Sequence, residues 1–197
     1  MGIIQNALLL VQVKAANGIG YGSGFIASSD GYAFTCNHVI ENAESIRVRV
    51  RVPGRIGGDD SWHNATVVKT DKLIDIALIK LEGENFPTMP VAPIGYHILP
   101  GDDIALLGYP FGAKLTDDIS LLNASLFEER ISSSQAVQGC ERLYVDIQAK
   151  RGNSGGPVID RNTGCVTTTR VIVFQIGFLL LPLEVLLMPE RLPFEYV

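Results

Sequence analysis

Apolar and polar positions alternate most regularly over residues 45–52, where apolar side chains take turns with arginines. A period of two residues predicts a strand with one buried and one solvent-facing side, so Arg47, Arg49 and Arg51 are assigned to the solvent. A helical period is expected only near the C-terminus, as a short closing helix over about 183–190. Short apolar runs predict further strands at 7–13, 66–69, 76–81, 104–107, 143–147 and 171–175.

The composition favours an all-β chain folded as one domain over 1–197. The 197 residues are 47% hydrophobic and include 20 glycines and 10 prolines, which suits many short strands joined by tight turns. A chain of this length can bury a sizeable core. The apolar run 171–188 approaches the length of a membrane span, but polar residues and a proline interrupt it, so we assign it to the core and expect no membrane span.

The net charge of the chain bears on whether it binds nucleic acid. The net charge is −5 and the isoelectric point is near 5.2, which argues against general affinity for phosphate backbones. The three arginines of the alternating strand are therefore interpreted as a solvated face, and no nucleic acid is expected as a partner. The few cysteines and histidines show no ligand spacing, so neither a metal nor another cofactor is expected.

The most informative motif is GNSGG at 152–156. It places Ser154 in a glycine-lined turn, where backbone N–H groups can converge on the oxygen that becomes negative in a tetrahedral intermediate. Glycine permits the unusual dihedral angles and the close approach to substrate that this arrangement needs. The same residue types are also common in ordinary tight turns, so the motif alone leaves both interpretations open.

A serine nucleophile needs a base and an acid that orients the base. Of the three histidines, His38 follows an apolar, strand-like run, whereas His63 and His97 lie in polar or connecting stretches and are interpreted as structural. Asp75 and Asp103 each begin an apolar strand, and both give the chain order histidine, aspartate, serine. Local pattern does not separate these two aspartates, although the Pro-Gly context of Asp103 suggests a turn, in which its acid is a strand-entry residue.

Five motifs in order resemble the trypsin-like serine proteases, and among them the HtrA/Deg branch: GSGFI at 22–26, TCNHVI at 35–40, DIAL at 75–78, GYPFG at 108–112 and RGNSGGP at 151–157. The resemblance covers the protease domain, from about residue 8 to about 186. It implies two packed antiparallel six-stranded β-barrels, about 7–95 and 100–182, with the active site between them. It also implies that His38 is the general base, Asp75 its orienting acid and Ser154 the nucleophile, with the N–H groups of Gly152 and Ser154 forming the oxyanion hole.

Departures from the family qualify these expectations. Asn153 precedes the nucleophile and has no charge to pair with a newly cut N-terminus, so activation by cleavage is not expected. Gln148 near the specificity pocket is uncharged, which favours cleavage after an uncharged residue, and Arg170 either contacts substrate or faces solvent. Residues 117–139 are expected to form a mobile regulatory loop. HtrA-like proteins usually carry PDZ domains; none follows residue 197, so the chain is either a bare protease or part of a longer one.

The sequence therefore predicts a serine endopeptidase acting on proteins or peptides, with active-site loops ordered by substrate or by a regulatory partner. The alternative is a partner-gated effector, chaperone or binding module on the same fold.

The three cysteines, Cys36, Cys140 and Cys165, are odd in number and far apart, and no signal peptide is visible. These observations predict a cytoplasmic location, unless the chain is a trimmed secreted or periplasmic form. Cys36 is interpreted as a small buried residue rather than a reactive thiol.

Overall fold

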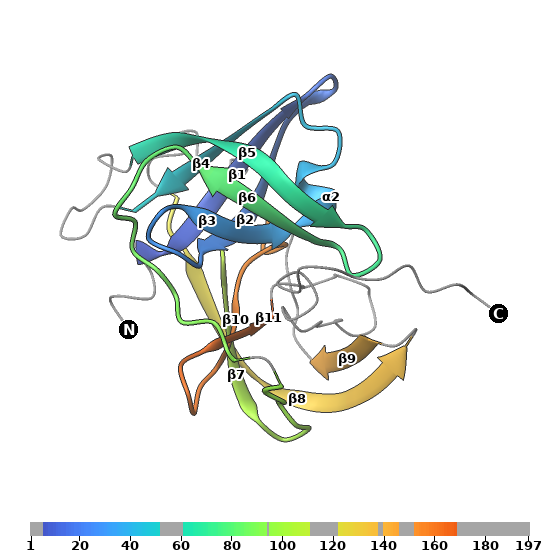
Figure 1. The fold of residues 1–197 in the computed structure, drawn as a ribbon. Helices are drawn as coiled ribbons and strands as arrows, with labels where there is room; N and C mark the ends of the chain where they lie inside the picture. Colours follow the sequence, from blue (N-terminus) through green and yellow to red (C-terminus); the bar gives the residue numbers. More distant parts are fainter. Residues whose placement is uncertain are drawn as a thin grey trace.

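The structure is a computed structural model, and it describes residues 6–51, 61–93, 95–110, 122–137, 140–145 and 152–168. Two β units are stacked one above the other, a closed barrel from the first half of the chain and a second sheet from the other half (Figure 1). The connection between them runs from the last barrel strand down to the first strand of the second sheet (Figure 1). The predicted all-β fold is confirmed.

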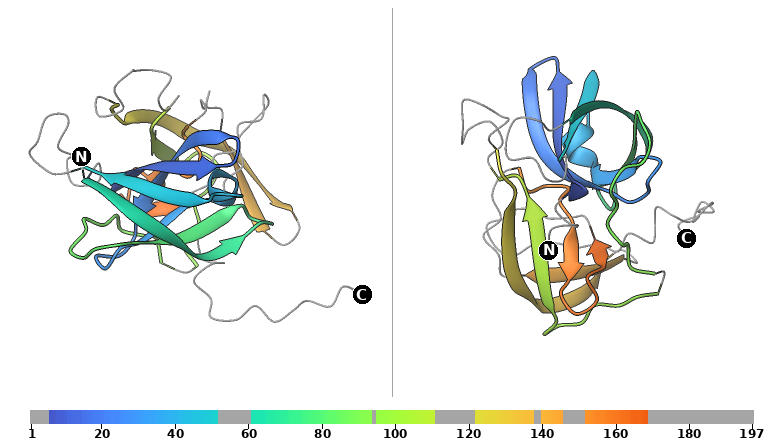
Figure 2. Two further views of the ribbon diagram at one scale, coloured as in Figure 1. Left: turned by 90° about the horizontal axis from the view of Figure 1, so that it is seen from above. Right: turned by 90° about the vertical axis from the view of Figure 1, so that its left-hand side faces the viewer.

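The described residues of the barrel form six strands and include the short helix α2. Its strand order is β1-β2-β3-β6-β5-β4, and β4 pairs back to β1 to close it, with every pair antiparallel. The helix α2 follows β3 directly and lies at one end of the barrel (Figure 2). The elements are β1 (Leu8–Ala15), β2 (Gly18–Ile26), β3 (Tyr32–Cys36), α2 (Asn37–Ile40), β4 (Ser45–Val50), β5 (Ser61–Asp71) and β6 (Ile76–Leu81).

The second unit is an antiparallel sheet with the order β11-β10-β7-β8-β9. The described residues supply five strands here, against the six expected for a second barrel. The expected strand at 171–175 and the expected helix at 183–190 lie outside the described residues. The strands are β7 (Asp103–Gly108), β8 (Ser125–Val137), β9 (Cys140–Val145), β10 (Val158–Asp160) and β11 (Val166–Thr168).

The larger of the two apolar clusters among the described residues runs through the barrel and into the second sheet. Inside the barrel the rings of Phe25 and Phe34 lie 5.6 Å apart between centroids. The same cluster of buried side chains includes Leu107, Tyr109 and Ile159 from the second unit. Because the two units share buried apolar contacts, their relative position is part of the fold rather than a flexible hinge.

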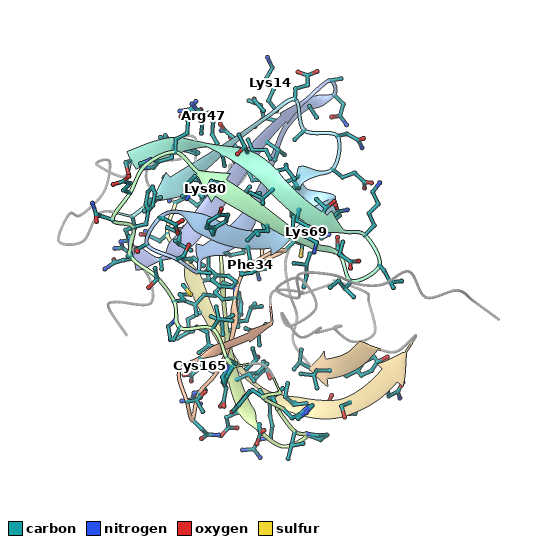
Figure 3. The ribbon with its side chains drawn as sticks, viewed as in Figure 1. Lys14, Phe34, Arg47, Lys69, Lys80 and Cys165 are labelled. Carbon is teal, nitrogen blue, oxygen red and sulfur yellow. The ribbon has the colours of Figure 1, made fainter. Side chains whose placement is uncertain are left out.

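The arginine strand departs from its prediction. Arg47 faces solvent as expected, over the ring of Trp62 with its guanidinium carbon 5.0 Å from the centroid (Figure 3). Arg49 belongs to the same side of β4 but is only 2% exposed. Its Nη2 donates to the carbonyl oxygen of Leu122 at 2.6 Å, and its guanidinium lies over Tyr109. The second unit covers this end of the strand, so the solvent-facing assignment of Arg49 is wrong.

The expected mobile loop at 117–139 is also wrong over most of its described part. Residues 125–137 form β8, the longest strand of the structure as described, which pairs with β7 on one side and with β9 on the other. Backbone hydrogen bonds to two neighbours hold this segment despite its serines and glutamates. Among the described residues no helix has the length and apolar character to cross a membrane, and the run 171–188 falls outside them.

Candidate active site

The pairing of β3 with β6 brings His38 and Asp75 together. Cys36 at the end of β3 pairs with Ile76 at the start of β6, so the residues just beyond these ends meet at one edge of the barrel. His38 lies in α2, immediately after β3, and the N–H of Asn37 donates to the carbonyl oxygen of Asp75 at 3.0 Å. Two residues 37 positions apart in the sequence therefore occupy neighbouring positions on a rigid scaffold.

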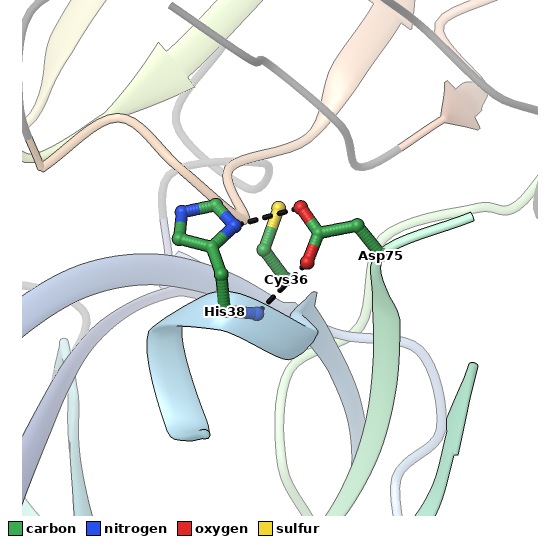
Figure 4. Close-up of side chains that lie close together, drawn as sticks. All are labelled: Cys36, His38 and Asp75. Atoms are coloured by element: carbon green, nitrogen blue, oxygen red, sulfur yellow. Dashed lines mark hydrogen bonds and ion pairs between the residues drawn. The ribbon is translucent and has the colours of Figure 1, made fainter. Parts of the chain in front are cut away.

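The carboxylate of Asp75 contacts His38 through both oxygens (Figure 4). Oδ1 accepts the backbone N–H of His38 at 2.8 Å, and Oδ2 lies 2.7 Å from Nδ1 of the ring. An ionised carboxylate only accepts hydrogen bonds, so Nδ1 carries the proton and Nε2 keeps its lone pair. The Asp75 side chain is 9% exposed, whereas that of His38 is 46% exposed and open to an incoming molecule.

Asp75 has φ = 55°, a left-handed backbone that costs energy in a residue with a Cβ. The preceding turn supports it, because Oδ1 of Asp71 accepts the N–H groups of Leu73 and Ile74. The strained backbone therefore belongs to Asp75, the residue whose carboxylate contacts His38. Such outliers persist where the surrounding structure fixes them, often at functional sites.

The turn that carries Ser154 belongs to the second unit but is bound to the barrel through Ser23 of β2. The N–H of Ser23 donates to the carbonyl oxygen of Ser154 at 2.8 Å, and its hydroxyl donates to the carbonyl oxygen of Gly152 at 2.7 Å. The Ser23 hydroxyl also accepts the N–H of Tyr109 at 2.9 Å, and its carbonyl accepts the hydroxyl of Thr35 at 2.7 Å. Ser23 is fully buried, and its bonds to Thr35 and Tyr109 are buried, while its bond to Gly152 is partly buried.

The glycines after the nucleophile are required by close backbone approach. A Cβ at Gly155 would lie 2.2 Å from the carbonyl oxygen of Ser23, and Gly155 has φ = 87°. A Cβ at Gly156 would lie 2.0 Å from the carbonyl oxygen of Leu107. The GNSGG motif therefore lets the turn fit between β2 of the barrel and β7 of the second sheet.

A cavity of about 470 Å³ joins the two sides of the site. Its lining includes the exposed side of His38 together with Gly152 and Ser154. The hairpin between β1 and β2 and the far end of α2 form the remaining wall, with lining residues Val13, Ala15, Asn17, Gly18, Ile19, Gly20, Tyr21, Val39 and Glu41. A polypeptide segment in this cavity would contact the imidazole and the serine turn at the same time.

Asn153, which precedes the candidate nucleophile, is completely buried. In the described part of the chain, neither its Oδ1 nor its Nδ2 has a hydrogen-bond partner. A charged side chain at this position would be far more costly to bury than the neutral amide. The sequence showed that the side chain at this position is neutral, but it did not show that Asn153 is buried.

The remaining predicted residues divide into three groups. His63 lies in β5 with Nε2 2.8 Å from Oγ of Ser61 and Nδ1 2.9 Å from the carbonyl oxygen of Glu82, consistent with a structural role, and His97 lies in a connecting segment. Asp103 begins β7 and pairs with Nε of Arg130 at 2.9 Å, away from His38. The predicted pocket residues, Gln148 and Arg170, lie outside the described residues.

Comparison with known proteins assigns the fold to a family. The model for the trypsin-like peptidase domain matches residues 22–167. The chain belongs to this family. Curated relatives include a probable periplasmic DegP-like serine endoprotease of Pseudomonas putida (strain W619), 33% identical over 141 residues. Another is the putative serine protease HhoB of Synechocystis (strain ATCC 27184 / PCC 6803 / Kazusa), 30% identical over 164 residues.

Coverage differs between the chain and these relatives. The alignments cover 72% and 81% of this chain but only 27% and 37% of the two relatives. Among solved structures, the serine endoprotease from Yersinia pestis matches with a TM-score of 0.75 and 24% identity, covering 93% of this chain and 61% of that one. The HtrA-type protease AlgW with a tripeptide gives a TM-score of 0.74 at 24% identity, covering 92% and 57%. The resemblance to the HtrA/Deg branch is thus confirmed.

The relatives contradict the predicted cytoplasmic location. The DegP-like relatives from Pseudomonas and Marinomonas are named as periplasmic, which points to a periplasmic or secreted location instead. The cysteine argument failed because an odd number of cysteines does not require a reducing compartment. Cys36 is fully buried, so its thiol is shielded from exchange with other thiols in either environment.

Proposed function

We propose that the protein is a periplasmic or secreted serine endopeptidase that hydrolyses peptide bonds through an acyl-enzyme. In this proposal Ser154 is the nucleophile, His38 the general base and Asp75 the acid that orients it. The observation that carries the proposal is the 2.7 Å contact between Nδ1 of His38 and Oδ2 of Asp75, beside a cavity lined by both His38 and Ser154. The active unit comprises both β units, as one domain.

The proposed mechanism uses the tautomer that Asp75 favours. Nε2 of His38 takes the hydroxyl proton as Ser154 attacks the peptide carbonyl, and it later gives that proton to the leaving amine. Asp75 stabilises the imidazolium without itself being protonated. A water molecule then repeats these steps on the ester of Ser154 and frees the enzyme.

The N–H groups of Gly152 and Ser154 are proposed to form the oxyanion hole. Each donor lowers the barrier by roughly 3–4 kcal/mol in enzymes of this kind, so the orientation of the peptide group that carries the Gly152 N–H decides whether the site is active. The bond from the Ser23 hydroxyl to the Gly152 carbonyl oxygen supports this placement, because it fixes one face of the turn. Gly152 has φ = 101°, a conformation suited to glycine.

Substrates are proposed to be proteins or peptides that enter as extended segments. The neutral, buried Asn153 supports control by the ordering of active-site loops on binding substrate or a partner, rather than by pairing with a new N-terminus. Gln148 supports cleavage after an uncharged residue. Both proposals concern regulation and specificity, and the chemistry does not depend on them.

A fluorophosphonate probe tests the central proposal. The wild-type protein should be labelled covalently, and Ser154→Ala should not, because the probe requires an activated serine. Ser132→Ala is the matched control, since Ser132 is an exposed serine of β8 whose hydroxyl donates to the Tyr144 carbonyl oxygen. Equal labelling of wild type and Ser154→Ala would overturn the assignment of the nucleophile. Absence of labelling in the wild type, with peptides present to order the loops, would favour a binding module on the same fold.

A further inference from the structure

Cys36 has no role in the proposed hydrolysis, yet it lies beside the residues that perform it. It ends β3, two residues before His38, and it is completely buried. A donor atom of each of Cys36, His38 and Asp75 lies within 4.8 Å of the other two. The close-up shows the sulfur near the carboxylate oxygen that contacts His38 (Figure 4).

We propose that these three side chains form a binding site for a divalent zinc-type cation, and that an ion bound there switches the active site off. A thiolate, an imidazole nitrogen and a carboxylate oxygen are the three kinds of protein ligand that zinc takes. A soft thiolate also favours zinc over magnesium or calcium, which prefer oxygen ligands. The sequence did not predict this site, because Asp75 joins the other two only through the pairing of β3 with β6.

The distances suit a tetrahedral ion after a small adjustment. With bonds of about 2.0–2.3 Å, ligand atoms around zinc stand roughly 3.2–3.8 Å apart. The three donor atoms fall within 4.8 Å of one another, and Nδ1 of His38 has to move roughly 0.5–1 Å away from Oδ2 of Asp75, now at 2.7 Å. His38 is in a short helix and its side chain is 46% exposed, so the ring has room to make that shift.

Charge balance also favours the bound state. A thiolate and a carboxylate together carry two negative charges, which a divalent cation neutralises. Buried charges in proteins are commonly paired or bound to a metal, and Cys36 and Asp75 are both buried. The proton of the Cys36 thiol leaves to solvent when the ion binds. The ring of His38 loses its proton at Nδ1 and takes one from solvent at Nε2, so it stays neutral, and a water molecule completes the fourth position.

The consequence for catalysis follows from the tautomer and rests on the proposed function. When Nδ1 of His38 binds the ion, the proton of the neutral ring is carried by Nε2. The nitrogen that faces the cavity then donates a hydrogen bond instead of accepting one, so it cannot take the proton from Ser154. The Asp75 carboxylate is also withdrawn from its orienting role. The ion is therefore an inhibitor of the site, and removal of the ion restores activity.

Cobalt(II) tests binding without any need for activity. Co²⁺ substitutes for zinc in tetrahedral sites, and a thiolate ligand gives it an intense charge-transfer absorption in the near ultraviolet. The wild-type protein should show this band, and Cys36→Ala should not. Cys165→Ala and Cys140→Ala are the matched controls and should keep it; Cys165 lies between β10 and β11 of the second sheet, away from the barrel (Figure 3). A wild-type protein without the band, or a band that survives Cys36→Ala, overturns the site.

Zinc inhibition of fluorophosphonate labelling tests the consequence. Labelling of the wild type should fall at least tenfold in saturating Zn²⁺ and return when a chelator is added. Cys36→Ala, checked for folding by its thermal transition, should need roughly tenfold more zinc or beyond for the same inhibition, because one ligand is lost. Equal sensitivity of wild type and Cys36→Ala overturns the proposed switch. If the wild type is not labelled without zinc, the hydrolase proposal fails instead, and the cobalt band still decides the metal site.

Discussion

His38 and Asp75 are held within one barrel by their own strands, whereas Ser154 comes from the second unit and reaches the barrel through Ser23. The first pair depends on the register of β3 with β6 and on contacts between residues of the same sheet. The serine turn depends on hydrogen bonds to a residue about 130 positions earlier in the chain. Substitutions in the His38–Asp75 pair should therefore lower activity with little effect on stability, whereas substitutions in the serine turn should lower both.

Asp75→Asn tests the first half of this comparison and has the largest expected effect. An asparagine tolerates the left-handed backbone of this position and still accepts the N–H of His38. Its amide N–H₂ then faces Nδ1, which favours the wrong tautomer of the imidazole. We expect kcat to fall about 10⁴-fold with an almost unchanged thermal transition, measured by peptide cleavage and calorimetry.

Asp103→Asn is the matched control for that change. Asp103 was the other candidate in the sequence, and it forms an exposed ion pair with Arg130. Its replacement should leave kcat within a few-fold of wild type, because surface ion pairs contribute little to stability and none to the chemistry here. A loss of activity in Asp103→Asn as large as in Asp75→Asn would contradict the assignment of the acid.

Gly155→Ala tests the serine turn through its backbone. The added methyl group would lie 2.2 Å from the carbonyl oxygen of Ser23. The turn also requires φ = 87° at this position, which is unfavourable for alanine. We expect the free energy of unfolding to fall by about 1–2 kcal/mol from the backbone and by about 1–3 kcal/mol from the clash. Fluorophosphonate labelling should fall with it, because the turn no longer fits against β2.

Gly164→Ala isolates the backbone part of that cost. Gly164 has φ = 73°, but a Cβ there meets nothing within 4 Å. Chemical denaturation should show only the backbone loss of about 1–2 kcal/mol, with labelling retained. If both alanine variants lose the same stability and both keep their labelling, the close approach of Gly155 to Ser23 does not position the nucleophile.

Local pattern predicted strands of the barrel, whereas the choice of Asp75 over Asp103 came from the family resemblance. The strand at 76–81 coincides with β6, and the motifs placed His38 and Asp75 where the strands bring them together. In the sequence, Ser23 is distinguished only by its place in the GSGFI motif. Its role arises from hydrogen bonds to the carbonyl oxygen of Gly152 and to Tyr109, and neither contact leaves a periodic signal in the sequence.

The errors in the fold have a common physical origin. Arg49 alternates with apolar residues just as Arg47 does, but the second unit covers only one of them. The segment at 125–137 is rich in serine and glutamate, and backbone pairing with two strands decides its structure rather than its side chains. Periodicity reports which side of a strand is apolar and does not report what packs against the other side.

Ser23→Ala tests the hydrogen bonds between the barrel and the serine turn, and its expected effect is smaller. The change leaves the Gly152 carbonyl and the Tyr109 N–H without their buried partner, at a cost of about 1–3 kcal/mol for each group in unfolding free energy. Because the Gly152 carbonyl fixes the peptide group next to the one that carries the Gly152 N–H, its release should loosen that donor, and kcat should fall roughly tenfold while KM changes little. Ser28→Ala is the control: its hydroxyl bonds only to exposed groups of its own turn, Asp30 and the N–H of Tyr32, and its loss should cost less, about 0.5–1 kcal/mol, with kcat unchanged. A stability loss in Ser23→Ala with kcat unchanged would make Ser23 a purely structural residue.

The smallest expected effect concerns the second unit, where the hydroxyl of Tyr96 donates a hydrogen bond to Oδ2 of Asp160 at the end of β10. Burial tends to raise the pKa of Asp160, but hydrogen bonds from Tyr96 and the turn at Asn162 and Thr163 outweigh it and lower the pKa below its ordinary 3.8. The same hydrogen bond to Asp160, followed by partial burial, raises the pKa of Tyr96 above 10.0.

These two shifts fix the pH range in which the Tyr96–Asp160 contact contributes to stability. The lowered pKa of Asp160 means that its contribution is complete above pH 3.8 and is lost as the pH falls further. The raised pKa of Tyr96 means that its contribution is present below pH 10.0 and is lost as the pH rises. Tyr96→Phe should cost about 1 kcal/mol in urea unfolding at pH 7 and less at either extreme, with catalysis unaffected. A cost that is the same at pH 3 as at pH 7 would show that the hydroxyl does not hold the Asp160 carboxylate in its ionised form.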